Sequence, residues 1–185
     1  MGQPPTDASP DRPAVPHVRA VFIGPMASGK SKLGKRVARA LGAPFHDTDK
    51  MVSAEHGDIP TIFATHGEQQ FRIWERQAVK NALGLGGVVS LGGGAILDPE
   101  TRADLSHQTV VYLHITPDVV ARHLNASTRP LLADGIEAWE RIFAERRPLY
   151  ESVATVDFDT SSAHLANLTD EVAGWITLRE AGSNE

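Results

Sequence analysis

The chain has 185 residues, is 41% hydrophobic and carries a formal net charge of −5 at pH 7. This length and composition suit one globular domain with a sizeable core. The net negative charge argues against nucleic acid or an anionic membrane surface as the main partner. With no cysteine in the sequence, disulfides and thiolate metal sites are excluded.

The N-terminal segment 1–17 contains five prolines and no apolar run. It therefore cannot supply the hydrophobic part of a secretory signal, and we expect a disordered tail. No stretch of the chain approaches the roughly 20 apolar residues that a membrane helix needs. A protein without such signals is expected in the cytoplasm.

A phosphate-binding loop is the strongest motif. It fits G-x-x-x-x-G-K-[ST] and reads Gly24, Pro25, Met26, Ala27, Ser28, Gly29, Lys30, Ser31. The glycines let successive backbone N–H groups point at one anion, the lysine adds a charge for the outer phosphates, and the serine hydroxyl can hold Mg²⁺. An apolar run at 18–23 predicts a buried strand before the loop, and the stripe in 32–41 predicts a helix after it. The sequence therefore predicts a nucleoside triphosphate site.

The second predicted strand starts at 44–46 and ends in Asp47-Thr48-Asp49, so two aspartates stand at its carboxyl end. Alternation along an extended segment places both side chains on the same side, at the edge where ligands bind in α/β sheets. One carboxylate could then serve a metal and the other a substrate hydroxyl. The alternative is that one of them caps a helix starting near Lys50. The residues alone leave both interpretations open.

Helices are expected over 50–84, separated at Gly57 and Gly67. Arg72 and Glu75 are three residues apart and so share a helix face. They form either a solvated surface pair or a pair in which Glu75 orients Arg72 toward an anionic substrate. Phe71 and Trp74 are expected in the core.

A third strand at 86–91 ends in three glycines, Gly92, Gly93 and Gly94. Such a run indicates either backbone packed close to a ligand or a need for positive φ. A helix opening at 98–100, a strand at 109–115 and a helix from 116 follow.

Arg129 lies in a predicted loop, where it is either a lid residue over bound phosphates or an exposed arginine. The helix predicted over 137–150 ends with Arg146 and Arg147, whose charge suits the helix dipole there. A fifth strand at 153–159 and a helix at 164–178 complete the domain, and residues 179–185 are expected to fray. Strands and helices alternate throughout, which predicts an α/β fold with a parallel sheet covered on both faces.

Together these segments resemble the shikimate kinases over 18–178. The similarity rests on the phosphate loop and on five further motifs, which are Asp47-Thr48-Asp49, Ile62 to Arg72, Ser90 to Gly94, Arg129-Pro130-Leu131-Leu132 and Arg146 to Tyr150. The resemblance implies a three-layer P-loop kinase fold with strand order 2-3-1-4-5. It also implies a helical substrate-binding region at about 48–76 and a lid at about 123–136.

The resemblance further assigns roles to individual residues. Asp49 matches the aspartate that contacts the accepting hydroxyl, while Arg72 and Arg146 match the pair that grips the shikimate carboxylate. Gly92, Gly93 and Gly94 match the backbone beside the shikimate ring. Phe63, Phe71 and Glu75 are expected among the substrate-binding residues. Asp47 matches a carboxylate that meets Mg²⁺ through water. Arg122 matches the arginine along the adenine, and Arg129 the lid arginine that reaches the transferred phosphate.

The chain departs from the family pattern at three positions. Ala27 stands where the family usually has glycine, Lys32 follows Ser31 in place of threonine, and Leu165 lies near a frequent proline of the adenine pocket. Ala27 narrows the allowed backbone angles without breaking the loop pattern, and Lys32 leaves Ser31 available for the metal.

The functional hypothesis is ATP-dependent phosphorylation of the shikimate 3-hydroxyl by a monomer, with Lys30, Asp49 and Arg129 as catalytic residues. Two alternatives are a kinase of another hydroxy acid, such as gluconate, and a non-catalytic regulator that binds a nucleotide.

Overall fold

The computed structural model describes residues 17–123, 135–162 and 164–182. Its centre is a five-stranded parallel sheet with the order β2-β3-β1-β4-β5. The predicted strand order and α/β class are therefore confirmed. In chain order the strands are β1 (Val18–Ile23), β2 (Phe45–Asp47), β3 (Gly87–Ser90), β4 (Val110–His114) and β5 (Val156–Asp159).

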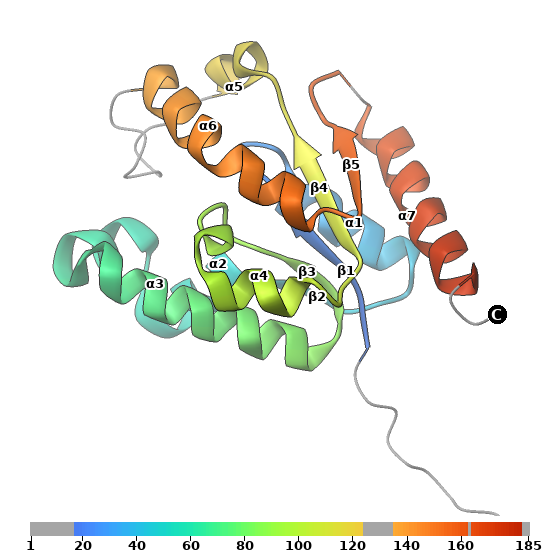
Figure 1. Ribbon diagram of the computed structural model, residues 1–185, viewed down its shortest axis with the longest axis horizontal. Coiled ribbons are helices and arrows are strands. Elements are labelled where there is room, and N and C mark those ends of the chain that lie inside the picture. Colours follow the sequence, from blue (N-terminus) through green and yellow to red (C-terminus); the bar gives the residue numbers. More distant parts are fainter. Residues whose placement is uncertain (1–16, 124–134, 163, 183–185) are drawn as a thin grey trace, which may run out of the picture.

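The helices cover both faces of this sheet (Figure 1). They are α1 (Lys30–Ala40), α2 (Thr48–His56), α3 (Ile59–Leu85), the short η1 (Ala95–Leu97), α4 (Pro99–Leu105), α5 (Pro117–His123), α6 (Ile136–Val153) and α7 (Leu165–Gly182). Helices α1 and α7 lie on one side of the sheet, and α3, α4 and α6 lie on the other.

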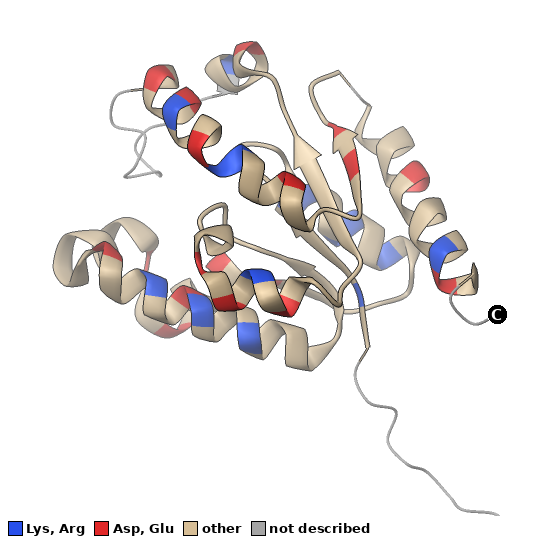
Figure 2. Cartoon of the chain, in the orientation of Figure 1, with Lys and Arg blue, Asp and Glu red and all other residues tan. Residues whose placement is uncertain are grey.

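Alternate side chains of the central strands build two separate cores. Val21 and Ile23 of β1 join the core beneath α3 and α6, whereas Ala20 and Phe22 join the core beneath α1 and α7. This follows from the two-residue period of a strand. Because both faces are covered, β3 and β4 contain no charged residue, and Figure 2 shows the charges mostly on the outer helices.

Several predicted boundaries need correction. The sixth helix continues through Pro148 to Val153, so Arg146 and Arg147 lie in its body, where the predicted interaction with the helix dipole does not apply. The last helix extends to Gly182, four residues beyond the predicted end. Its final turn is tied to β1 by Glu180, which accepts a hydrogen bond from Arg19 Nε at 2.8 Å. Residues 179–182 therefore do not fray.

The region after β2 contains the predicted helices in a slightly different form. Helix α2 begins already at Thr48, and Gly57 follows its last residue. Gly67 interrupts α3 with the non-helical angles φ 78° and ψ 169°, as the sequence predicts for a break at this glycine. The tail at 1–16 and positions 124–134 of the predicted lid lie outside the described residues, and no described helix is long and apolar enough to cross a membrane.

Candidate active site

The phosphate loop runs from the end of β1 to the start of α1, in the context that the motif requires. Gly24 has φ +143°, and a Cβ atom at this position would overlap the carbonyl oxygen of Leu113 on β4. Gly29 has φ +81° and precedes the first residue of α1. Both glycines are therefore needed by the backbone. Lys30 and Ser31 follow in the first helical turn, where backbone N–H groups favour an anion.

Ala27 is the one non-glycine among the described residues with positive φ, at 71°. Left-handed backbone is unfavourable for alanine by an amount on the order of 1 kcal/mol. Ala27, where the family usually has glycine, therefore keeps the loop conformation but makes it less favourable in conformational free energy. Lys30 is buried, and its Nζ donates to the carbonyl oxygen of Pro25 at 2.7 Å.

A cavity of about 430 Å³ opens beside this loop. Its wall combines the loop with side chains of α2, α3 and α6 and with the backbone after β3. Of the residues predicted from sequence it includes Met26, Ala27, Gly29, Lys30, Ser31, Lys32, Asp49, Phe63, Phe71, Arg72, Glu75, Gly93, Gly94 and Arg146. Ammonium, carboxylate and guanidinium groups from distant parts of the chain thus meet in one space.

Arg72 is fixed at this wall by two carboxylates. Its Nη1 lies 2.7 Å from Oε2 of Glu75, and its Nη2 lies 2.8 Å from Oε1 of Glu68. Glu75 is only 3% exposed. The surface-pair interpretation of Arg72 and Glu75 is therefore wrong, because one member of the pair is buried.

Glu75 occupies the centre of the charged groups. Burial raises its pKa to about 7; the charge of Arg72 opposes the rise, Asp49 adds to it and Arg146 opposes it. Burial lowers the pKa of Arg72, but the two glutamates outweigh this, so its pKa is raised and it stays cationic. A half-buried guanidinium is thus oriented by a buried carboxylate whose pKa is raised to about 7.

The glycine run provides room for these side chains. A Cβ atom on Gly92 would come within 2.6 Å of Glu75 Oε1, and one on Gly94 within 2.6 Å of the Arg72 guanidinium carbon. The φ angles of Gly92, Gly93 and Gly94 are not positive. The explanation by positive φ is therefore wrong, and the groups that approach this backbone closely include the charged side chains of Glu75 and Arg72. Close packing against a ligand stays a prediction.

Asp47 and Asp49 differ in their surroundings. Asp47 is the N-cap of α2, and its Oδ1 accepts from the backbone N–H of Lys50 at 3.2 Å. Asp49 lies in the first turn of that helix and lines the cavity. The chain is already helical from Thr48, so the strand alternation used in the prediction does not extend to Asp49. The capping interpretation holds for Asp47.

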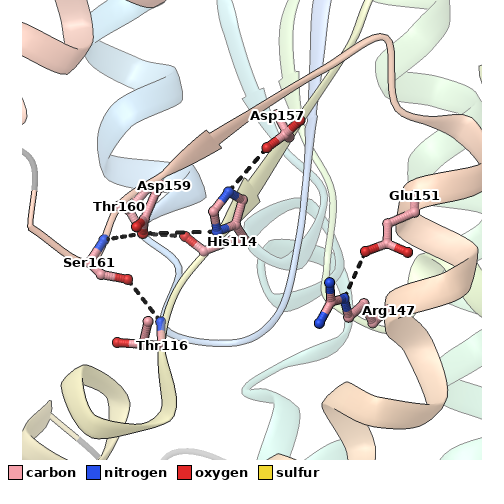
Figure 3. Close-up of polar contacts among 8 residues, drawn as sticks. All are labelled: His114, Thr116, Arg147, Glu151, Asp157, Asp159, Thr160 and Ser161. Atoms are coloured by element: carbon pink, nitrogen blue, oxygen red, sulfur yellow. Dashed lines mark hydrogen bonds and ion pairs between the residues drawn. The ribbon is translucent and has the colours of Figure 1, made fainter.

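The two adjacent arginines of α6 also differ. Arg146 is buried and lines the cavity, whereas the Arg147 side chain is 61% exposed and its Nε donates to Glu151 at 2.7 Å (Figure 3). Successive helical residues point about 100° apart, so only one of them can face the cavity.

Figure 3 also shows how the segments after β4 and β5 are joined. The backbone N–H of Thr116 donates to Ser161 Oγ at 2.9 Å, and Thr160 donates to the carbonyl oxygen of His114 at 3.0 Å. Arg122 is exposed on α5 and does not line the cavity, and Arg129 lies outside the described residues.

The donor set beside the loop suits Mg²⁺, which prefers hard oxygen ligands and retains water. Ser31 offers a hydroxyl at the cavity wall. Asp47 is buried nearby at the end of β2, and its two oxygens can accept about four hydrogen bonds. Asp47 can therefore cap α2 and also contact Mg²⁺ through water.

Sequence reasoning missed several supporting residues. Ile59 and Leu91 line the cavity, and Thr48 Oγ1 accepts from the backbone N–H of Gly92 at 3.0 Å. Glu68 was detectable, since it stands four residues before Arg72 on one helix face. The other contacts join segments far apart in the chain and leave no local pattern.

Comparisons with known proteins show the family to which the chain is related. The shikimate kinase family model matches residues 26–177. The shikimate kinase of Frankia casuarinae is 40% identical over 189 residues, covering 100% of this chain and 84% of that relative. The shikimate kinase of Mycobacterium tuberculosis (strain ATCC 25177 / H37Ra) is 46% identical over 148 residues, covering 77% of this chain and 84% of the relative.

Solved structures show the same fold. The Acinetobacter baumannii shikimate kinase in complex with shikimate has a TM-score of 0.79 at 29% identity, covering 90% of this chain and 95% of that one. A gluconokinase from Sinorhizobium meliloti 1021 has a TM-score of 0.63 at 21% identity, covering 92% and 97%, which indicates a shared fold alone. With the family model and the curated relatives in agreement, this chain belongs to the shikimate kinase family.

Proposed function

We propose that this chain transfers the γ-phosphoryl group of ATP to the 3-hydroxyl of shikimate, giving shikimate 3-phosphate and ADP. Membership of the shikimate kinase family supports this function. The observation that carries it is that Lys30, Asp49 and Arg72 line one cavity. They supply a cation for phosphate, a carboxylate for a hydroxyl and a guanidinium for a carboxylate.

The phosphate loop holds the nucleotide in this proposal. Its backbone N–H groups and the Lys30 ammonium bind the phosphates, and Lys32 adds a positive charge at the same wall. Ser31 would hold Mg²⁺ directly and Asp47 through water. The metal, when bound, neutralises phosphate charge and lowers the barrier to transfer.

The acceptor half recognises a hydroxylated ring with a carboxylate. Arg72 and Arg146 bind the carboxylate, because a planar guanidinium pairs with it through two parallel hydrogen bonds. The rings of Phe63 and Phe71 are tilted 45° to each other at this wall, with centroids 4.9 Å apart, and offer an apolar surface to the substrate ring. The backbone of Gly93 and Gly94 also lines this cavity.

Asp49 is the proposed proton acceptor. The substrate oxygen forms a bond to the γ-phosphorus while the bond from that phosphorus to the bridging oxygen breaks. ADP leaves with the electron pair, and the hydroxyl proton passes to the Asp49 carboxylate. A cavity that positions both reactants provides most of what this reaction needs, since phosphoryl transfer depends chiefly on positioning and charge stabilisation.

Other assignments are proposed from the sequence. They are the single kinase domain at 18–178, its substrate-binding region at 48–76, its lid at 123–136, the adenine contact of Arg122 and the phosphate contact of Arg129. The monomeric state is likewise proposed from the sequence. A cytoplasmic location also stays a prediction.

A coupled assay of ADP release tests the function. The purified chain is incubated with ATP and Mg²⁺ together with shikimate, gluconate or no acceptor. ADP should form rapidly only in the reaction that contains shikimate, and not with gluconate or without an acceptor. Turnover with gluconate but not with shikimate would support a different hydroxy-acid kinase. Nucleotide binding without acceptor-dependent turnover would support the regulator.

A further inference from the structure

Three buried residues of α6 face the active site. Trp139 and Tyr150 are each 1% exposed, and Arg146 is 7% exposed. They are spaced by seven and four residues, which places them on one face of the helix. Arg146 lines the cavity itself. Its two neighbours on this face instead contact backbone of the cavity wall, at Met26 and at Gly93, where the phosphate loop and the glycine run lie next to each other.

Trp139 contacts the phosphate loop. Its indole Nε1 donates to the carbonyl oxygen of Met26 at 2.9 Å, across 113 positions of sequence. A peptide group is planar, so fixing the Met26 carbonyl also fixes the direction of the Ala27 N–H. Ala27 is the residue with the unfavourable left-handed backbone. Such a conformation persists when its surroundings hold it in place.

Tyr150 contacts the glycine run. Its hydroxyl donates to the carbonyl oxygen of Gly93 at 2.5 Å, and its ring stacks on Tyr112 at a centroid distance of 5.4 Å. The same peptide-plane argument fixes the N–H of Gly94, the residue packed against Arg72. Burial raises the pKa of Tyr150 far above its ordinary value, so the hydroxyl keeps its proton.

We propose that Trp139 and Tyr150 are positioning residues through which α6 fixes the orientation of the phosphate loop and of the adjacent glycine run relative to each other. Trp139 acts on the ATP half through Met26, and Tyr150 acts on the shikimate half through Gly93. This inference rests on the proposed function. One helix then aligns the γ-phosphoryl group with the accepting hydroxyl, and phosphoryl transfer is sensitive to this alignment.

The test is a pair of substitutions with opposite expected effects. Trp139→Phe removes the indole N–H and should raise KM for ATP about three- to tenfold, leaving KM for shikimate within about twofold. Tyr150→Phe keeps the stacked ring, removes only the hydroxyl and should show the reverse pattern by similar factors. Each variant is the control for the other.

A packing control separates positioning from general loosening. Val120→Ala deletes buried methyl groups in the cluster that contains Trp139 and should lower the melting temperature with both KM values unchanged. If Trp139→Phe and Tyr150→Phe raise both KM values equally, or change neither, the proposal is wrong and α6 contributes packing alone.

Two further measurements cover the remaining cases. If Trp139→Phe does not fold, hydrogen exchange of the Trp139 indole N–H in the wild-type protein decides, because a bonded N–H must be protected and rapid exchange would overturn the proposal. ADP titration without acceptor reports the ATP half separately. A wild-type protein inactive on shikimate would refute the proposed function, while weaker ADP binding by Trp139→Phe would still support the Trp139 assignment.

Discussion

Arg72 Nη1 and Glu75 Oε2 lie 2.7 Å apart on adjacent turns of α3, and the glutamate of this pair is buried. A surface ion pair contributes at most about 1 kcal/mol, whereas breaking a buried pair costs about 3–5 kcal/mol. The pair therefore fixes the guanidinium in one orientation at the cavity wall. The acceptor half of the site depends on this arrangement.

Arg72→Ala should selectively damage shikimate use. The substrate carboxylate loses a charged partner, so kcat/KM for shikimate is expected to fall. The decrease should correspond to a loss of about 2–5 kcal/mol of transition-state stabilisation. Steady-state kinetics measure this. Arg76→Ala is the matched control, because Arg76 pairs with Asp104 at 2.8 Å and does not line the cavity. Unchanged kinetics for Arg72→Ala would remove Arg72 from the carboxylate site.

Asp49→Asn should abolish most turnover. The amide is nearly isosteric but cannot accept the hydroxyl proton, so kcat is expected to fall about 10²- to 10⁴-fold. KM for ATP should stay within about twofold, since the phosphate loop is untouched. Asp58→Asn, at the exposed N-cap of α3, should leave kcat unchanged. A kcat of Asp49→Asn near the wild-type value would show that another group accepts the proton.

Gly94→Ala should act through Arg72. The added Cβ would lie within 2.6 Å of the guanidinium carbon, and the end of a flexible side chain yields more readily than backbone. We expect KM for shikimate to rise at least about tenfold, because Arg72 is pushed from its orientation. Gly174→Ala, in a helix with open space around the glycine, should raise stability by about 0.5–1 kcal/mol with no kinetic effect. Unaltered shikimate kinetics in Gly94→Ala would contradict this packing.

Glu75→Gln should change how stability depends on pH. The pKa of Glu75 is raised from 4.5 to about 7 in the folded protein, so below pH 4.5 the carboxyl is protonated in both states. Between these values the folded state binds more protons, and stability falls as pH rises through 7. The quantity to compare is the free energy of unfolding of the wild type minus that of Glu75→Gln. This difference should decrease by about 1–3 kcal/mol between pH 5 and pH 8.

Urea unfolding at several pH values measures this difference. Glu68→Gln is the control, since Glu68 pairs with the same arginine but has an exposed side chain. A constant difference between wild type and Glu75→Gln over this pH range would mean that Glu75 does not titrate near neutral pH.

Sequence patterns alone determined the secondary-structure order and the phosphate loop. Strand and helix periods depend on residues that are close together in sequence. The phosphate loop is specified in the same way, by the spacing of Gly24, Gly29, Lys30 and Ser31. Similarity over 18–178 added the strand order, which the structure confirms.

Only the tertiary structure decided which charged groups meet. Asp47 caps a helix while Asp49 faces the cavity, Arg146 is buried while Arg147 is exposed, and Glu75 is enclosed beside the glycine run. Each outcome depends on where helices pack on the sheet, and that packing brings together residues as distant in sequence as Met26 and Trp139. Local patterns contain no record of such contacts, because their energy comes from burial and hydrogen bonds that exist only after folding.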